Sequence, residues 1–225
     1  MRNPDIAEVV DSIIQGINNT QEDYKKAYES DVCSSYAPEY LMIVYIFQSI
    51  LELNKKNDHT YGLSLEEPVH ELARLLRAHP RYPYHARVYG YCDVSIRDVN
   101  NSDKPRAMIE VKKYAWNYSE EIGRLAYFVE KGLKFGVFAS CWFEEVRDDD
   151  CKEAEDRLEK EIQCIHEHIE KDISELGYNL NVDRKPGNIA ILRLDGDKET
   201  WKWCPVCFVI QNKKRTSGKS SILPG

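Results

Sequence analysis

The stretch of residues 87–113 constrains the fold most strongly, because it carries charged side chains within or next to two short apolar runs. These runs are Val94-Ser95-Ile96 and residues 107–111, and a segment rich in Asn, Ser, Asp and Pro separates them. Two short runs on either side of such a segment are typical of β-strands joined by a turn region. The sequence therefore predicts a pair of strands here, with a loop between them.

Alternation along these strands brings their charged residues to one face. Successive strand side chains point to opposite faces of a sheet, so Glu110 and Lys112 share one face whereas Val111 points to the other. In the first strand, Asp93 lies on the face opposite Val94. If both strands turn their apolar faces to one core, two carboxylates and an ammonium group converge on the other side.

This constellation resembles the PD-(D/E)xK nuclease superfamily, whose fold is that of many restriction endonucleases. The matching residues are Asp93 and, after sixteen intervening positions, Glu110-Val111-Lys112. Cys92 stands where the proline of the family's name would be. The alternative interpretation is a surface sheet face that carries an ordinary Glu–Lys pair.

The resemblance implies a metal-dependent nuclease that hydrolyses phosphodiester bonds, with DNA favoured over RNA. Asp93 and Glu110 would bind Mg²⁺ or Mn²⁺ together with the backbone carbonyl of Val111, because oxygen donors suit these ions. Lys112 would stabilise the negative charge of the transition state. The rival expectation is a catalytically inactive domain of this fold, which binds nucleic acid or a protein partner without cutting.

In the nuclease families that this chain resembles, a helix before the first strand often lends a further acid to the site. The first candidate is Glu39, in the first turn of a helix predicted at residues 34–54. A carboxylate at that position also complements the helix dipole, which is an equally good reason for its presence. Three later acids are the alternatives: Glu66, Glu67 and Glu71.

Basic and aromatic residues near the proposed site are candidates for contact with nucleic acid. The basic ones are Arg87, Lys113 and Arg124, and the resemblance implies that Arg124 faces the site from the helix after the second strand. Residues 81–87 also mix tyrosines, a histidine and arginines. Such rings and bases can stack on and neutralise nucleic acid, and the alternative is a Tyr/Pro loop packed over the sheet edge.

The predicted fold class is α/β (α+β), with a restriction-endonuclease-like core in which helices flank a central mixed sheet. The order helix, three strands, helix, strand over residues 34–142 is that of the nuclease core, and its last strand, 135–142, is apolar enough to be buried on both faces. Residues 1–33 are expected to be a helical extension that Asn18-Asn19-Thr20 interrupts. Residues 143–212 should form a long acidic helix and an appended β-hairpin, and 213–225 a flexible basic tail.

The charge of the chain is concentrated in the predicted long helix. The chain has a net charge of −7, and residues 144–176 alone contain fourteen acidic and five basic residues. This distribution argues against tight non-specific binding to duplexes, but not against a nucleic-acid substrate. Apolar residues at spacings of three and four also run along this helix, so residues 150–176 should either form a homodimer or pack on their own domain: Leu158, Ile162, Ile165, Ile169 and Ile173.

Other sequence features exclude several classes of protein. No apolar run approaches the ~20 residues of a membrane span, and the N-terminus lacks the pattern of a secretory signal, so no membrane partner is expected. Seven cysteines without regular spacing predict reduced thiols and a cytoplasmic location. Cys204 and Cys207 form a CxxC pair, but no second pair follows, which argues against a zinc site.

Overall fold

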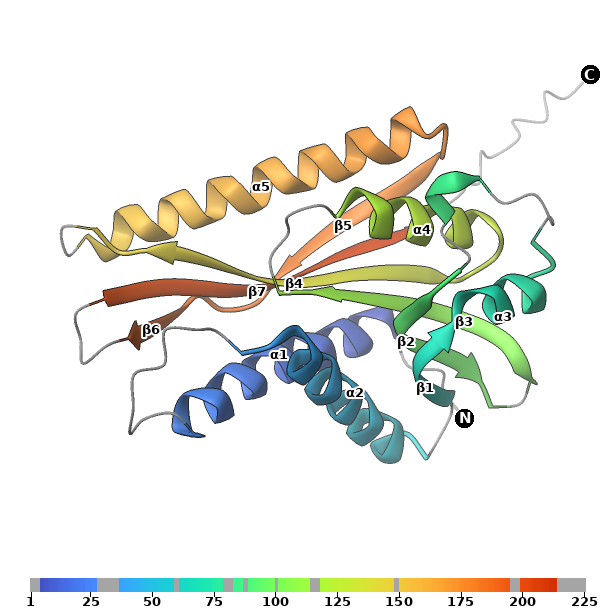
Figure 1. Cartoon of the computed structure of the whole chain (residues 1–225), viewed down its shortest axis with the longest axis horizontal. Coiled ribbons are helices and arrows are strands. Elements are labelled where there is room, and N and C mark those ends of the chain that lie inside the picture. The colour runs from blue at the N-terminus through green and yellow to red at the C-terminus, as the bar shows by residue number, and fades with distance from the viewer. Residues whose placement is uncertain are drawn as a thin grey trace, which may run out of the picture.

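The computed structural model describes residues 5–27, 37–58, 61–78, 83–86, 89–99, 101–113, 118–147, 150–194 and 199–213. These ranges form an α+β fold with a mixed sheet between helices (Figure 1). The helices are α1 (Ile6–Ala27), α2 (Glu39–Lys56), α3 (Val69–Leu75), the 3₁₀ turn η1 (Tyr84–Ala86), α4 (Ser119–Glu130) and α5 (Cys151–Glu175). The strands are β1 (Tyr61–Pro68), β2 (Tyr91–Asp98), β3 (Asn101–Lys112), β4 (Phe135–Glu145), β5 (Leu180–Pro186), β6 (Ala190–Leu194) and β7 (Glu199–Asn212).

The strands form one sheet in the order β1-β2-β3-β4-β7-β5, and β6 pairs with β7. All neighbours are antiparallel except β3 and β4, which run parallel. A parallel pair needs a crossover connection, and α4 supplies it. The predicted central mixed sheet flanked by helices is thus confirmed at the level of fold class.

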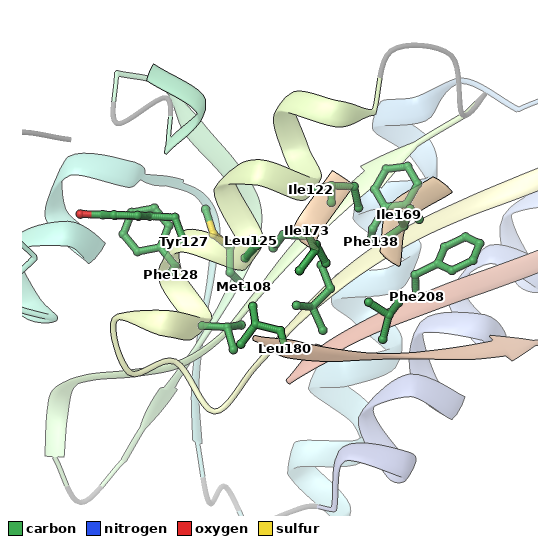
Figure 2. Close-up of a cluster of buried hydrophobic side chains, with 14 of the residues drawn as sticks. Met108, Ile122, Leu125, Tyr127, Phe128, Phe138, Ile169, Ile173, Leu180 and Phe208 are labelled. Carbon is green, nitrogen blue, oxygen red and sulfur yellow. The ribbon is translucent and has the colours of Figure 1, made fainter. Parts of the chain in front are cut away.

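Both faces of the sheet are buried. Helices α1 and α2 cover one face, and α4 and α5 cover the other (Figure 1). Successive residues of β4 alternate between the two cores, since Val137 packs with α1 and α2 whereas Phe138 packs with α4 and α5. Figure 2 shows the second core, which includes Leu125 of α4 and Ile169 of α5. The prediction that residues 135–142 form a strand buried on both faces is confirmed.

The predicted loop between β2 and β3 is much shorter than the sequence suggests. Strand β3 already begins at Asn101, and its pairing with β2 continues past an irregularity at Arg97, which lies opposite Pro105. The parallel ladder with β4 starts only at Ala107. Pro105 therefore lies where β3 has no β4 partner, and a missing N–H group is tolerated there.

Helix α1 continues through Asn18-Asn19-Thr20, which were expected to interrupt it. The Thr20 hydroxyl donates to the Gly16 carbonyl at 2.7 Å, and the Gln15 amide donates to the Asn19 side chain at 2.6 Å. These polar groups are satisfied within the helix instead of competing with it. At Gly16 a Cβ atom would lie 2.6 Å from the Cα atom of Ile46, so glycine allows α1 and α2 to pack closely.

The C-terminal strands are an integral part of the sheet rather than an appendage. The hairpin of β6 and β7 forms as predicted, but β7 also pairs along its length with β4, from Gly136 to Glu145. Strand β5, at the far edge of the sheet, was not expected from the sequence. The hairpin loop at 195–198 and, apart from Lys213, the predicted tail lie outside the described residues.

The apolar stripe of α5 packs on its own domain. Four of its five residues are almost fully buried in the core beneath the helix, and Ile165 is partly buried against the same core. This stripe is therefore not available as a dimer seam, and a homodimer through the rest of α5 stays a prediction. Within the described ranges, no helix has the length and apolar character to cross a membrane.

Candidate active site

The residues singled out from the sequence meet where β2 and β3 approach the beginnings of α2 and α4. The regular ladder between β2 and β3 has its last pair at Val94 and Ile109. Beyond that pair, the Asp93 carboxylate continues the connection, because its Oδ2 atom accepts a hydrogen bond from the Val111 backbone N–H at 2.6 Å. The backbone of one strand thus orients the acid of the other.

Glu110 lies beneath α4 and is only 2% exposed. Its Oε2 atom is 2.8 Å from the Nη2 atom of Arg124, which is itself 6% exposed. The second oxygen, Oε1, is buried and has no hydrogen-bond partner among the described residues. A buried carboxylate oxygen without a partner carries a desolvation penalty of about 1–3 kcal/mol or more. This oxygen is one of the unsatisfied polar groups of the site.

Lys112 and Glu39 form the outer part of the cluster. The Nζ atom of Lys112 lies 3.3 Å from the Oε1 atom of Glu39. The Oε2 atom of Glu39 accepts a hydrogen bond from the Lys113 backbone N–H at 3.1 Å. Glu39 thus joins the first turn of α2 to the end of β3.

The alternative candidates for the auxiliary acid are placed elsewhere. Glu66 is exposed and has a φ of 49°, which marks an irregularity in β1. Glu67 is buried at the sheet edge and forms an ion pair with Arg97 of β2. Glu71 pairs with Arg74, its neighbour on α3, at 2.8 Å. Of these four acids, Glu39 is the one whose carboxylate contacts Lys112.

The structure adds Glu121, which sequence reasoning missed. Glu121 is 6% exposed, and its Oε1 atom lies 3.6 Å from the Nζ atom of Lys112. Its Oε2 atom is buried, and no described residue is hydrogen-bonded to it. Glu121 and Arg124 are three residues apart and so share one face of α4. Glu121 and Arg124 are oppositely charged and each precedes an apolar residue of the helix, Ile122 or Leu125. This pattern is the signal that could have identified them.

The three basic residues expected to contact nucleic acid have different settings. Arg124 is buried against Glu110. Lys113 is partly buried and, through its backbone, holds Glu39 in place. Arg87 lies outside the described residues. Two residues earlier in the chain, the imidazole of His85 packs beside Gly123 of α4, where a Cβ atom would lie 3.0 Å from that of His85.

Burial raises the proton affinity of both acids on the strands. For Asp93, desolvation raises the pKa to about 6, although the Val111 N–H and Lys112 oppose it. For Glu110, desolvation raises the pKa to about 8 against the attraction of Arg124, and the charge of Asp93 adds to the rise. Without a further cation, this pair of carboxylates therefore resists full ionisation at neutral pH.

Lys112 remains a cation. Burial by itself would lower the pKa of its amine, but Glu39 and Glu121 outweigh this effect and hold the pKa above its ordinary value. An ammonium group between two carboxylates is thus fixed in charge as well as in position. It is suited to stabilise an anion and not to accept a proton.

The acidic side chains of the site are of the type that binds cations such as Mg²⁺ or Mn²⁺ through oxygen atoms. Asp93 and Glu110 offer carboxylate oxygens, and the buried Oε1 atom of Glu110 has no described partner. Arg124 occupies the other oxygen of Glu110. Over the part of the chain that the structure describes, no group of three or more His, Cys, Asp or Glu side chains is arranged to hold a metal ion. Asp93 and Glu110 therefore match a divalent cation in ligand type and charge, but the described residues do not form a complete coordination shell.

The two cysteines of the CxxC pair lie in the hydrophobic cores of the protein. Cys204 and Cys207 are both buried in β7, but they belong to the cores on opposite faces of the sheet. Positions three apart in a strand point in opposite directions, so the two sulfur atoms cannot bind one ion.

No protein-family model, no curated protein and no solved structure matches this chain. The case for a function therefore depends on the residues and geometry of the site.

Proposed function

We propose that this protein is a metal-dependent nuclease that hydrolyses phosphodiester bonds, with DNA as the favoured substrate. The observation that carries the proposal is the convergence of Asp93, Glu110 and Lys112, in the spacing of the PD-(D/E)xK superfamily, at one end of β2 and β3. The element order α2-β1-β2-β3-α4-β4 supports it, although the short helix α3 is inserted after β1. Glu39 supports it as well, since it reaches this site from the helix before β1.

The carboxylates would bind a divalent ion. Two buried acids with raised pKa values, one of which has an unpartnered oxygen, form a site that a cation would relieve. Asp93 and Glu110 would hold Mg²⁺ or Mn²⁺, with the Val111 carbonyl as the resemblance implies. When bound, such an ion neutralises phosphate charge and lowers the pKa of a coordinated water molecule.

Lys112 would act on the transition state. Because Glu39 and Glu121 keep its amine protonated, Lys112 can donate hydrogen bonds to phosphate oxygens as negative charge develops on them. The same two acids restrict where the amine can lie, so its position does not depend on the substrate. Lys112 therefore serves as a cationic hydrogen-bond donor rather than a general base in this proposal.

Arg124 would position Glu110. Its guanidinium group contacts one oxygen of that carboxylate and leaves the other available, which restricts the orientation of the acid. The contact is buried, so it is stronger than a surface ion pair and is costly to break from one side.

The Glu110–Arg124 pair also favours a second candidate function, a nuclease-like domain that binds nucleic acid or a protein without cutting. In that case the guanidinium group is the permanent counter-ion of Glu110, and no metal ion is needed. The two candidates differ in a simple way. The nuclease binds divalent ions at Asp93 and Glu110, whereas the binding domain does not.

Cleavage assays on the purified full-length chain test the proposal. Supercoiled plasmid, single-stranded DNA and RNA would each be incubated with Mg²⁺ or Mn²⁺. We expect divalent-dependent cleavage by the parent protein and its loss in Glu110→Gln. The matched control is Glu144→Gln, since Glu144 is a partly buried acid on β4 that pairs with Arg157 at 2.6 Å and lies outside the cluster. No cleavage of any substrate with either ion would refute the nuclease.

A Mn²⁺ titration separates the two candidates. The parent protein should bind Mn²⁺, and the double variant Asp93→Ala/Glu110→Ala should not. Binding of Mn²⁺ together with cleavage supports the nuclease. Absence of both supports the binding domain and removes the metal site.

A further inference from the structure

Four tyrosines are strongly exposed in the segments that border the candidate active site. Tyr89 and Tyr84 are 95% and 91% exposed, and Tyr40 and Tyr91 are 64% and 63% exposed. The other large hydrophobic residues with high exposure in the described ranges are aliphatic and lie singly on different elements. Exposed aromatic rings on segments that border one site favour a binding surface over a gap in packing.

Two of these tyrosines are close to acids of the site in the sequence. Tyr40 is the residue after Glu39, at the beginning of α2. Tyr91 lies two residues before Asp93 on β2. At a rise of about 3.3 Å per residue, their Cα atoms are about 7 Å apart.

Gly90 places Tyr89 at the same site. A Cβ atom at Gly90 would lie 4.0 Å from the Nη1 atom of Arg124, so the backbone between Tyr89 and Tyr91 approaches the buried guanidinium group. The Gly90 carbonyl also accepts a hydrogen bond from the Val69 N–H at 2.9 Å, which fixes this turn to the start of α3. The two exposed rings are therefore displayed from a backbone that is itself held against the site.

Tyr84 borders a hollow that shares α4 with the site. The hollow has a volume of about 310 Å³ and lies between η1, the first turn of α4 and the end of α5. Its wall at His85 is held by a 2.7 Å contact between the imidazole Nε2 atom and the Tyr178 hydroxyl. The acids Glu120, Asp172 and Glu175 line it, so it repels a phosphate but can accept hydrogen bonds from the N–H groups of a base.

These features favour unpaired bases over a duplex. Tyrosine rings bind nucleic acid by stacking on the face of a base, which is accessible only when the base is not stacked in a double helix. Duplex binding relies instead on many cations that contact phosphates. Here Glu39 and Glu121 flank Lys112, and Glu120 lines the hollow beside Tyr84, so these acids favour stacking over charge as the source of affinity.

We propose that Tyr40, Tyr84, Tyr89 and Tyr91 form a stacking platform for single-stranded nucleic acid. The substrate of the nuclease is then an unpaired strand, with its bases on the tyrosines and its backbone over Asp93 and Glu110. The part of this inference that concerns cleavage rests on the proposed function, whereas the part that concerns binding rests on the exposed rings alone.

Binding without divalent ions tests the platform independently of cleavage. One oligonucleotide sequence would be labelled and presented to the full-length chain in EDTA as single-stranded DNA, as RNA and as a DNA duplex. Fluorescence anisotropy should show tighter binding of a single strand than of the duplex, and the DNA and RNA samples identify which strand is preferred. Loss of one stacking ring should weaken binding by about fivefold or more.

The variants distinguish stacking from other contacts. Tyr89→Ala/Tyr91→Ala should lose binding, whereas Tyr89→Phe/Tyr91→Phe, which keeps both rings, should bind like the parent. Ile191→Ala removes an exposed side chain of β6 and is the control. All three substituted side chains are exposed in the parent, so circular dichroism should show unchanged folding.

Three outcomes overturn the platform: no binding of single strands, equal binding of duplex, or an alanine variant that binds like the parent. A protein that binds single strands through its tyrosines but does not cut them with Mg²⁺ or Mn²⁺ upholds the platform and refutes the nuclease. A protein that cuts duplex and single strands equally, with no effect of the alanine substitutions, upholds the nuclease and overturns the platform.

Discussion

Asp93→Asn should stabilise the protein at neutral pH when no divalent ion is present. Burial raises the pKa of Asp93 from 3.8 to about 6, so the folded state holds this proton more tightly than the unfolded chain does. The contribution of Asp93 to stability is therefore greatest below pH 4, and this contribution is lost as the pH rises through 6. Asparagine does not titrate and can still accept the hydrogen bond from the Val111 N–H, so the variant avoids this loss.

The size of the effect follows from the shift of the pKa. A rise of about two pH units corresponds to roughly 3 kcal/mol of stability lost between pH 4 and pH 6. Water reaches part of the Asp93 carboxylate and screens its charge, so we expect about 1–2 kcal/mol in practice. At pH 7 the variant should be more stable than the parent by this amount, and near pH 4 the difference should vanish.

Excess Mg²⁺ should reverse the order of stability. A ligand that binds only the folded state at a concentration of about a hundred times its Kd adds roughly 2.7 kcal/mol. The parent protein would gain this stabilisation, whereas the variant would gain less because it has lost one carboxylate ligand. An acid that weakens the fold until a cation binds is what a metal site requires, and an acid retained only for structure would not behave in this way.

Urea unfolding at pH 4, 5.5 and 7, with EDTA or with Mg²⁺, measures these differences. The matched control is Asp98→Asn at the other end of β2, where the carboxylate faces Arg106 at 3.8 Å instead of other acids. That control should not be stabilised at any pH. The reasoning is refuted if Asp93→Asn is less stable than the parent at pH 7 in EDTA, if the gap does not depend on pH, or if Mg²⁺ stabilises both proteins equally.

Three further predictions concern other parts of the molecule. Lys112→Ala should bind Mn²⁺ like the parent but lose cleavage, because the amine of Lys112 acts on the transition state. Mn²⁺ titration and cleavage assays measure the two properties, and a loss of Mn²⁺ binding would contradict this role. Glu39→Gln should slow cleavage less than Glu110→Gln in single-turnover assays, and a larger effect of Glu67→Gln would show that the auxiliary acid was misassigned. Ile169→Ala should lower the free energy of unfolding by about 2–5 kcal/mol, with unchanged sedimentation, since this side chain is buried within its own domain. A change in oligomeric state would show instead that α5 forms a dimer seam.

The convergence of Asp93, Glu110 and Lys112 was predictable because it depends on local rules. A strand places alternate residues on one face, and two strands joined by a short turn must be neighbours. The same locality explains why β4 was recognised from its apolar run alone. Glu39 was also a candidate, because the start of a helix before β1 can be read from Pro38 and the apolar residues that follow.

Features that depend on contacts distant in sequence were not predictable in the same way. The burial of Arg124 on Glu110 requires the crossover through α4, and neither residue reveals the partnership by itself. The central place of β7 in the sheet depends on its pairing with β4, which lies about seventy residues earlier in the chain, and loop length is a weak guide to such pairing. In α1 the polar cluster was misread because turn-forming residues were assumed to compete with the helix, whereas Thr20 is satisfied within it.

The charges of the cluster give the strongest reason to regard it as a site rather than as part of the scaffold. Four carboxylates (Asp93, Glu110, Glu39 and Glu121) surround two cations (Lys112 and Arg124), so full ionisation leaves two negative charges in a largely buried space. A scaffold gains nothing from such an excess, because each unpaired buried charge costs stability. Desolvation by burial raises the pKa values of Asp93 and Glu110, so the protein can neutralise the excess either with protons or with one divalent cation. Protons alone would leave Glu110 uncharged at neutral pH, whereas a divalent cation would balance the cluster and at the same time contact the Glu110 oxygen that has no partner among the described residues.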